Sequence, residues 1–386
     1  MSNTPKIRFA GFTENWEQHK LGDLGSVAMC RRIFKEQTTE VGEIPFYKIG
    51  TFGNHADAYI SRELFEEYKS KYPYPQKGDI LVSASGSIGR TVEYTGKDEY
   101  FQDSNIVWLM HDERLENSFL KYFYQVVKWS GLEGSTIKRL YNSNILRTKI
   151  ILPSSSDSDE QKLIGALMAT LDKLIDHHQH KYEKLISLKT ACLDKMFPQN
   201  DHKVPEVRFA GFTEDWKPYK IREIANRYDN LRVPVAAKLR IPGTTPYYGA
   251  NGIQDYVDGF THEGDFVLVA EDGANDLKNY PVQYVQGKIW VNNHAHVLQS
   301  KPGMANNPFL AYAINRADIE SFLVGGGRAK LNAETLMDIK IVMPDVEEQQ
   351  KIGLYLNSVE TLITLQKRKV EKLKQLKQSM LHNMFV

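Results

Sequence analysis

The strongest constraint on this chain is an internal repeat. Residues 5–16 have the sequence PKIRFAGFTENW and residues 205–216 have PEVRFAGFTEDW, so nine of the twelve positions are identical. A second pair of matching segments, DEQKLIG at 159–165 and EEQQKIG at 347–353, opens the last part of each half, which then runs to a Met-Phe pair in both copies. Self-similarity of this kind indicates two copies of one structural unit.

The segments between these markers have diverged. Residues 17–145 and 217–335 share only short fragments, such as PFY at 45–47 with PYY at 246–248. An old gene duplication followed by drift is one interpretation. Drift alone would not keep the borders of the repeat nearly identical while the inserts between them diverge. We therefore favour two individually selected surfaces in a common scaffold.

Each half ends in a segment that is predicted to form one long helix. In residues 160–197 and in the matching C-terminal segment, apolar residues recur at alternating spacings of three and four without a proline, which is the heptad pattern of a coiled coil. A buried helix inside one compact domain is the alternative. The positions predicted to form the seam between the helices are Leu167, Leu171, Leu174, Leu185, Leu188, Val359, Leu362, Leu373 and Leu376.

The short connection at 198–205 sets the orientation of the helix pair. The first helix leads directly into the second globular part, so the second helix must run back to bury its seam, and the pair is predicted to be antiparallel. We expect an α/β (α+β) fold with a pseudo-two-fold repeat, in which two mixed, β-leaning globular domains are joined by two long antiparallel coiled-coil helices. The expected boundaries are 1–152 and 205–343 for the globular domains, and 153–204 and 344–386 for the spacer helices.

Loops rich in small polar residues make the two inserts candidate DNA-binding surfaces. Glycine lets the backbone approach a ligand closely, as in the segment 83–90, and Ser, Asn and Arg side chains can bond base edges. Basic residues near the end of each insert suit phosphates, although a Lys-Arg pair is more commonly a solvated surface and the tyrosines could equally be core. The candidate DNA-binding residues are Lys48, Ser85, Ser87, Arg90, Lys138, Arg139, Tyr248, Asn251, Asn275, Arg328 and Lys330.

Sequence motifs for catalysis are missing, and we predict no catalytic residue. The chain has no phosphate-binding GxxxxGK[ST] loop and no Asn-Pro-Pro-aromatic element for amino methylation. Asp57, Glu67 and Lys69 have a nuclease-like spacing, but Asp57 lacks a preceding proline and the Glu67 segment has the pattern of an exposed polar helix.

Two groups of histidines are candidate metal ligands, but their placement predicts no metal site. His177, His178 and His180 lie on the first long helix, where neighbouring positions do not face one another. His294 and His296 could share one face of a strand. Their counterparts in the first copy fall at about Asn105 and Val107, so the repeat implies no shared metal site.

The composition of the chain limits which partners and which cellular location are expected. The formal net charge is +1, which is weak for a chain that must hold a polyanion alone, so either local basic patches or a partner must supply charge. The two cysteines, Cys30 and Cys192, form no disulfide framework, and a reducing cytoplasm is the simplest location. Neither an apolar run of ~18 residues nor a signal-peptide core occurs, so no membrane association is expected.

The paired RFAGFTE-x-W openings, the two variable inserts and the two EQ-x-x-IG helices that end in Met-Phe resemble the specificity subunits of type I restriction–modification enzymes, over essentially the whole chain. The resemblance implies that each insert is a target-recognition domain for one half of a split sequence in double-stranded DNA. It implies that the helices set the gap and dock two adenine methyltransferase (modification) subunits, which restriction/translocase subunits join. It also implies no cofactor in this chain, because S-adenosylmethionine, ATP and Mg²⁺ belong to those partners.

Two other functions remain open at this point. A stand-alone DNA-binding nuclease with duplicated domains would show Mg²⁺-dependent cleavage by the purified chain. A coiled-coil adaptor that binds only proteins would protect no DNA in the full complex. The target bases and the gap length do not follow from the sequence.

Overall fold

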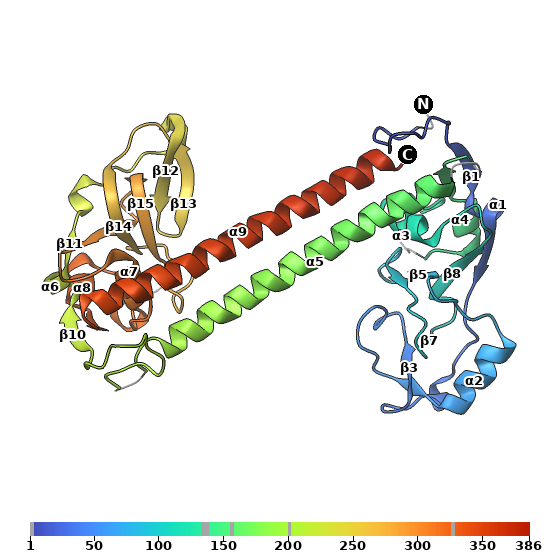
Figure 1. Ribbon diagram of the computed structural model, residues 1–386, viewed down its shortest axis with the longest axis horizontal. Coiled ribbons are helices and arrows are strands. Elements are labelled where there is room, and N and C mark those ends of the chain that lie inside the picture. The colour runs from blue at the N-terminus through green and yellow to red at the C-terminus, as the bar shows by residue number, and fades with distance from the viewer. Residues whose placement is uncertain (1–3, 133–138, 155–157, 200–201, 326–328) are drawn as a thin grey trace. The chain divides into compact units, whose positions relative to one another are not determined.

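The structure is a computed structural model that describes residues 4–132, 139–154, 158–199, 202–325 and 329–386. The chain divides into two compact units. Unit 1 comprises Met1–His178 and Lys369–Val386, and unit 2 comprises Gln179–Arg368. Both chain ends belong to unit 1 (Figure 1), where the Ile7 amide donates a hydrogen bond to the Asn383 carbonyl over 3.0 Å.

Unit 1 has a mixed sheet-and-helix architecture. The strand orders are β2-β8-β5-β6, β4-β3-β7 and β1-β9, and the core is rich in aromatic side chains around Trp16, Phe119 and Trp108. Its elements are β1 (Glu17–Lys20), α1 (Leu21–Leu24), β2 (Gly25–Ala28), η1 (Lys35–Gln37), β3 (Ile44–Tyr47), β4 (Tyr59–Ile60), α2 (Arg62–Lys71), β5 (Ile80–Ser83), β6 (Thr91–Glu93), β7 (Tyr100–Phe101), β8 (Ile106–His111), α3 (Asn117–Val126), α4 (Asn142–Arg147), β9 (Lys149–Leu152) and the first part of α5 (Ser158–Lys195).

Unit 2 contains a six-stranded sheet in the order β11-β16-β14-β15-β12-β13 and a two-stranded sheet β10-β17. Its core packs around Trp216, Phe309 and Leu336. Its elements are β10 (Lys217–Lys220), α6 (Ile221–Ile224), β11 (Ala225–Arg227), η3 (Asp229–Leu231), η4 (Ala237–Leu239), β12 (Pro242–Gly249), β13 (Gly252–Val257), β14 (His262–Ala270), β15 (Val282–Val291), β16 (Ala295–Ser300), α7 (Asn307–Asn315), η5 (Glu320–Phe322), α8 (Ala333–Asp338), β17 (Lys340–Met343) and the first part of α9 (Val346–Met384).

The two units repeat unusual backbone pairings as well as sequence. In unit 1, β3 and β7 run parallel with Phe46 opposite Tyr100, and in unit 2, β12 and β15 run parallel with Tyr247 opposite Trp290. Each of these register pairs is aromatic on both strands. The predicted mixed α/β, repeated fold is therefore confirmed, including in the inserts where the sequences have diverged.

The repeated sequence edges form the same buried ion pair in each unit. Arg8 of the first opening donates two hydrogen bonds to Glu160 at the start of α5, over 2.9 and 2.7 Å. Arg208 does the same with Glu348 at the start of α9, over 2.9 and 2.6 Å. Both carboxylate side chains are 0% exposed. A buried charge is strongly destabilising without its partner, which explains why both edges keep these residues.

The glutamine that follows each of these glutamates caps a second helix. The Gln161 side chain accepts from the backbone of Glu116, just before α3, over 3.0 Å. The Gln349 side chain accepts from the backbone of Asn306, just before α7, over 3.1 Å. The EQ pair therefore joins each long helix to its globular core, so it is a structural motif of the scaffold.

Ion pairs inside each unit show that α5 and α9 run antiparallel. In unit 1, Asp172 of α5 pairs with Lys377 near the end of α9, over 2.6 Å. In unit 2, Lys189 near the end of α5 pairs with Glu360 in the first part of α9. Early residues of one helix thus meet late residues of the other in both units, as the short connection predicted.

The register of the seam differs from the one predicted from the leucines. Of the predicted positions, Leu171 and Val359 are buried and Leu167, Leu185 and Leu373 are half-buried. Four others remain exposed: Leu174 and Leu188 at 41%, Leu362 at 45% and Leu376 at 42%. One heptad register of each helix is buried or half-buried at every position: Ile164, Met168, Leu171, Ile175, His178, Tyr182, Leu185, Lys189 and Cys192 in α5, and Ile352, Leu356, Val359, Ile363, Gln366, Val370, Leu373, Lys377, Met380 and Met384 in α9.

The reason for the shift is that two heptad registers share every second position. Both registers contain Ile164 and Leu171, and they differ only in whether Leu167 or Met168 lies between them. Leucine density favoured the former, whereas the structure buries Met168 fully. The anchoring of each helix start through the EQ pair sets the rotation of the helix, which a spacing argument does not include.

Among the described residues, no helix combines the length and the continuous apolar character needed to cross a bilayer.

Candidate nucleic-acid interface

The predicted recognition loop of unit 1 is tightly constructed. The hydroxyl of Ser83, at the end of β5, donates to the Ser87 carbonyl and accepts from the Arg90 amide over 2.9 Å. Gly86 and Gly89 have φ angles of +63° and +82°, a conformation that disfavours any side chain. Ser87 and Arg90 are exposed on this loop.

Other candidate residues of unit 1 lie next to this loop. The Leu140 amide donates to the Ala84 carbonyl over 2.8 Å, so the neighbouring Arg139 comes alongside. Arg139 also reaches the Ser104 carbonyl over 3.3 Å. The Ser85 hydroxyl donates to the Asn105 side chain over 2.8 Å. The structure therefore brings together residues from three segments that are distant in sequence.

Lys48 directly precedes Ile49, whose side chain lies close to Gly86 of this loop. Its ammonium group is 2.8 Å from the Asp57 carboxylate, and the side chain is 42% exposed. Asp57, the residue considered for a nuclease, is thus paired with a lysine on the surface. Lys138 of unit 1 and Arg328 of unit 2 lie outside the described residues.

In unit 2, the Asn251 side chain holds a loop in place. Its amide nitrogen donates to the Gly273 carbonyl over 2.8 Å, and its oxygen accepts from the Asn275 backbone over 3.0 Å. Asn251 was predicted as a base-contacting residue, but both ends of its amide already bond the backbone. The Asn275 side chain is exposed beside it.

Tyr248 and Lys330 occupy different environments. Tyr248 is half-buried against the core of the six-stranded sheet, and burial raises the pKa of its hydroxyl, which favours the core interpretation over DNA contact. Lys330 is 45% exposed and pairs with Glu271 over 2.9 Å. An antiparallel bridge pairs Lys330 with Val324.

The basic candidates occupy the same backbone position in the two units. The Leu331 amide donates to the Glu271 carbonyl over 2.7 Å, as Leu140 does to Ala84. Lys330 therefore corresponds to Arg139. Likewise the Glu271 amide donates to the His294 carbonyl over 2.9 Å, as Ala84 does to Asn105 over 2.7 Å. These bonds support the predicted equivalence of His294 with Asn105.

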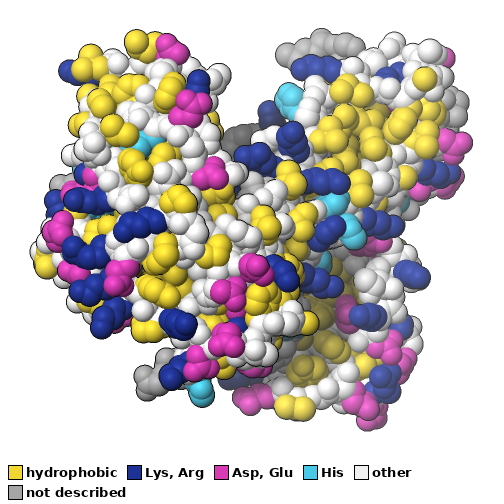
Figure 2. Space-filling view, turned by 60° about the vertical axis from the view of Figure 1, so that its left-hand side comes forward, with side chains coloured by type: hydrophobic (Ala, Val, Ile, Leu, Met, Phe, Trp, Pro, Cys, Tyr) yellow, Lys and Arg dark blue, Asp and Glu magenta, His cyan; other side chains and the backbone are white. Residues whose placement is uncertain are grey.

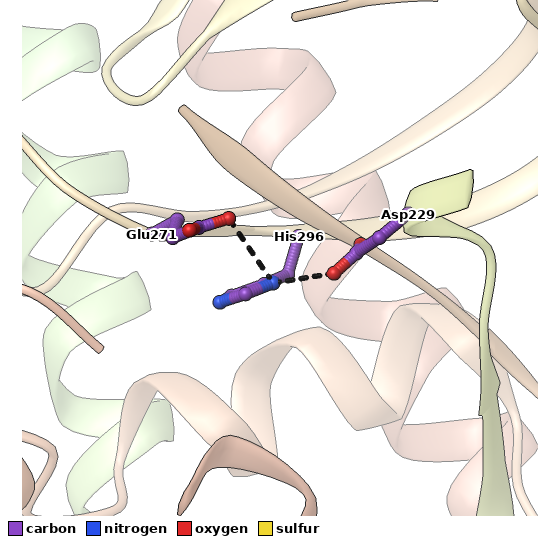
Figure 3. A group of neighbouring side chains, drawn as sticks. All are labelled: Asp229, Glu271 and His296. Carbon is purple, nitrogen blue, oxygen red and sulfur yellow. Dashed lines mark hydrogen bonds and ion pairs between the residues drawn. The ribbon is translucent and has the colours of Figure 1, made fainter. Parts of the chain in front are cut away.

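A charged cluster that the sequence did not predict includes Glu271, which begins the unit 2 loop that leads to Asn275. Asp229, Glu271 and His296 come from three different segments, and their ligand atoms lie within 4.8 Å of one another (Figure 3). Arg232 donates to Glu271 over 2.7 Å, and Lys330 pairs with the same carboxylate. Cationic side chains thus already neutralise this group.

Two carboxyl groups of this cluster stay ionised. Burial raises the pKa of Asp229, but the interactions with His296, the Val297 amide and Arg232 together outweigh it, so the pKa is lowered overall. The same holds for Glu271, whose burial is outweighed by hydrogen bonds from Arg232 and Lys330. The sequence signals were His296, a candidate metal ligand together with His294, and the acidic Glu271-Asp272 pair, which directly follows an apolar strand.

Charges of both signs are interspersed on the surface. In the space-filling view, lysine and arginine side chains lie among acidic side chains over the visible face (Figure 2). This agrees with the net charge of +1. Phosphate contacts would therefore depend on local groups such as Arg90 and Arg139.

The family model for the type I restriction modification DNA specificity domain matches the chain twice, at residues 13–186 and 213–375. The two matches cover most of the chain. This chain belongs to the type I restriction–modification specificity-subunit family. Its two matched domains are the two copies of the repeat, and each combines a divergent insert with the first part of a long helix.

Individual relatives agree with this assignment. The putative type I restriction enzyme specificity subunit S.HindORF215P of Haemophilus influenzae is 51% identical over 173 residues, which covers 42% of this chain and 45% of that relative. This match thus spans less than half the length of that relative. The putative type I restriction enzyme MjaX specificity subunit of Methanocaldococcus jannaschii is 22% identical over 416 residues, covering 98% of this chain and 95% of the relative.

The fold agrees over the full length with one solved structure. The crystal structure of a type I restriction–modification system S subunit from M. genitalium matches with a TM-score of 0.72 and 16% identity, covering 99% of both chains. At that identity the match shows a shared fold, with two repeated domains and long helices.

Proposed function

We propose that this chain recognises a bipartite sequence in double-stranded DNA, with one half-site read by each insert. The observation that carries the proposal is the shared backbone frame with different side chains in the two units. Matching backbone hydrogen bonds make Arg139 of unit 1 equivalent to Lys330 of unit 2, and both are basic. The same bonds make Ala84 of unit 1 equivalent to Glu271 of unit 2, and these two differ in charge and size. Two different surfaces in one frame suit two different half-sites separated by bases that are not read.

The domains of this proposal follow the repeat. Residues 1–152 and 205–343 are the two target-recognition domains, and residues 153–204 and 344–386 are the spacer segments. The DNA contacts proposed for the first domain are Lys48, Ser85, Ser87, Arg90, Lys138 and Arg139. Those proposed for the second are Asn275, Arg328 and Lys330, with Asn251 holding the loop.

We further propose that the long helices dock two modification subunits, through which restriction subunits join. Support comes from apolar side chains outside the helix seam. Leu174, Leu188, Leu362 and Leu376 are each more than 40% exposed, and Leu365 is 53% exposed. Exposed apolar side chains that gather in one area mark a surface for protein contact, and Leu362 and Leu365, three residues apart on α9, share one face of that helix. S-adenosylmethionine, ATP and Mg²⁺ would then bind to those partner subunits. This chain would catalyse nothing alone.

The test is methylation of DNA by the purified chain with and without modification subunits and S-adenosylmethionine. We expect no cleavage and no methylation by the chain alone, and methylation of adenines at one bipartite sequence by the complex. Mg²⁺-dependent cleavage by the chain alone would contradict the proposal and favour the nuclease. A complex that protects no DNA would favour the protein-only adaptor.

A further inference from the structure

His296 on strand β16 is buried, with 1% of its surface exposed, and both of its ring nitrogens face oxygen atoms. Nδ1 lies 2.7 Å from a carboxylate oxygen of Asp229 (Figure 3). Nε2 lies 2.9 Å from the backbone carbonyl of Leu331. A carbonyl oxygen only accepts hydrogen bonds, so Nε2 must carry a hydrogen atom.

The other ring nitrogen must carry a hydrogen as well. The Asp229 carboxylate accepts from the Val297 amide over 2.8 Å and from Arg227 over 3.2 Å. Two arginines face this carboxylate, Arg227 over 3.2 Å and Arg232 over 3.6 Å, and these cations favour its ionised form, so it has no proton to give. An ionised carboxylate is an acceptor, and the ring must donate to it from Nδ1. With hydrogens on both nitrogens, His296 is an imidazolium cation.

The charged groups around this ring come from every neighbouring segment. Glu271, after β14, is 3.7 Å from Nδ1, and it also contacts Arg232 and Lys330 over 2.7 and 2.9 Å. Arg232 approaches Asp229 to 3.6 Å from η3. Next to the cluster, His294 pairs with Asp272. His262 of β14 bonds the Tyr228 carbonyl over 3.1 Å, and burial lowers its pKa.

The His296 ring contacts both segments that carry the proposed DNA contacts of unit 2. Glu271 begins the loop that leads to Asn275, and Leu331 follows Lys330 directly. The equivalent described position of unit 1 cannot make this link, because the backbone hydrogen bonds place Ala84 where unit 2 has Glu271. Asn105 of unit 1 is equivalent to His294 of unit 2. Val107 and His296 each follow two residues later, so Val107 takes the place of His296 in unit 1. Ala84 and Val107 are both 1% exposed.

We propose that His296 is a positioning residue, held as an imidazolium, that fixes the Glu271–Asn275 loop and Lys330 for DNA recognition by unit 2. Removing its charge weakens recognition of the unit 2 half-site and leaves the unit 1 half-site unchanged. The inference about DNA rests on the proposed function, whereas the protonation state of the ring does not.

The first test is nuclear magnetic resonance of the full chain labelled with ¹⁵N-histidine. The His296 signals are assigned by their loss in His296→Gln. We expect hydrogens on both ring nitrogens at neutral pH, and no change when Zn²⁺ or a chelator is added. A ring with a hydrogen on only one nitrogen would overturn the proposal. So would a ring whose signals shift with Zn²⁺, because the cluster would then be a metal site.

The second test uses the complex with modification subunits and DNA duplexes that differ in one half-site at a time. His296→Gln is expected to weaken recognition of the unit 2 half-site about tenfold or more, with the other half-site unaffected. His202→Gln changes an exposed histidine of the same unit and serves as the matched control. Equal losses at both half-sites, or none, would overturn the proposal.

The double variant Glu271→Ala/His296→Val covers the case in which the single variant fails to fold. It places the two unit 1 residues in unit 2, so no uncompensated charge remains at either position. We expect a folded chain that recognises the unit 2 half-site more weakly than the wild-type chain does. A folded double variant with wild-type affinity for the unit 2 half-site would contradict the proposal. If the wild-type complex recognises no DNA, the proposed function fails, and the ring protonation stands separately.

Discussion

The two units share one scaffold and differ most at their recognition loops. Arg8 with Glu160 and Arg208 with Glu348 make the same buried pair with nearly the same distances. Behind the loops, unit 1 buries the small apolar Ala84, whereas unit 2 places Glu271 in an ionic cluster. The comparison teaches that the retained residues are those that join a long helix to its globular core. The side chains of the inserts can vary in sequence because contacts outside the inserts, at the start of each long helix, stabilise their backbone.

The largest effect is expected at the buried arginines, and it should differ between the units. Replacing Arg8 or Arg208 with Ala leaves a buried carboxylate, which costs ~3–5 kcal/mol in free energy of unfolding. In unit 1, Glu160 keeps a hydrogen bond from the Trp16 ring over 3.0 Å. The equivalent ring nitrogen of Trp216 has no hydrogen-bond partner among the described residues.

Arg208→Ala should therefore cost about 1 kcal/mol more than Arg8→Ala. Urea unfolding, followed by probes in each unit, measures the difference. Adding Glu160→Gln or Glu348→Gln to the matching arginine variant should recover part of the loss. Equal costs for the two arginines would show that the tryptophan does not distinguish the units.

The next effect separates the helix seam from the exposed leucines. Ile363 is 9% exposed and its neighbour Leu362 is 45% exposed. Ile363→Asp buries an unpaired charge and should cost about 3 kcal/mol in free energy of unfolding, whereas Leu362→Asp should cost below ~0.5 kcal/mol. In the proposed function, Leu362→Asp should instead abolish assembly with the modification subunits.

Thermal unfolding and gel filtration of the complex distinguish these outcomes. Ile175→Asp and Leu174→Asp give the matched pair in unit 1. If Leu362→Asp unfolded unit 2 as strongly as Ile363→Asp, the seam would follow the leucines after all.

How much the sequence predicted depends on the kind of interaction. Heptad spacing predicted both long helices and their antiparallel order, because these follow from period and connection length. It did not distinguish Leu167 from Met168 as the seam residue, because helix rotation is set by contacts of Glu160 and Gln161 with distant segments. Local spacing contains no information on such contacts.

The candidate site shows the same division. Loop composition located the segment around Ser85 and the basic pair Arg139 and Lys330, which the backbone brings together. It did not show that Asn251 bonds backbone at both ends of its amide, nor that Asp229 lies beside His296. These partners are 22 to 67 residues apart in sequence, and only the folded sheet brings them together.

A smaller effect compares the two cysteines, one in each unit. Cys30 is buried in unit 1, and burial raises the pKa of its thiol to about 12. Cys192 is half-buried on α5. Because the thiolate is the reactive form, iodoacetamide near pH 8 should label Cys192 at least about tenfold faster than Cys30.

Mass spectrometry of labelled peptides measures both rates in one sample. Labelling of Cys30 should rise only when urea unfolds unit 1, whereas raising the pH to 9 should leave it nearly unreactive. Rapid labelling of Cys30 in the native chain would contradict the burial of this thiol.

The smallest effect concerns salt dependence. Arg139→Ala and Lys330→Ala should each weaken DNA binding by the complex about equally for all sequences, and each should lower the slope of log affinity against log salt by about one. Ser87→Ala should instead relax one base position if its hydroxyl reads a base edge. A loss of sequence preference in the lysine or arginine variants would show that these residues recognise bases and not phosphates.

The central claim is that the two units recognise DNA independently within one scaffold. Its most direct test is a map of methylated adenines in cells that carry the modification subunits with this chain, before and after residues 17–145 are exchanged for another insert of the family. One half-site is expected to change while the other half-site and the gap stay the same. A change in both half-sites, or a target without an unread gap, would contradict the claim.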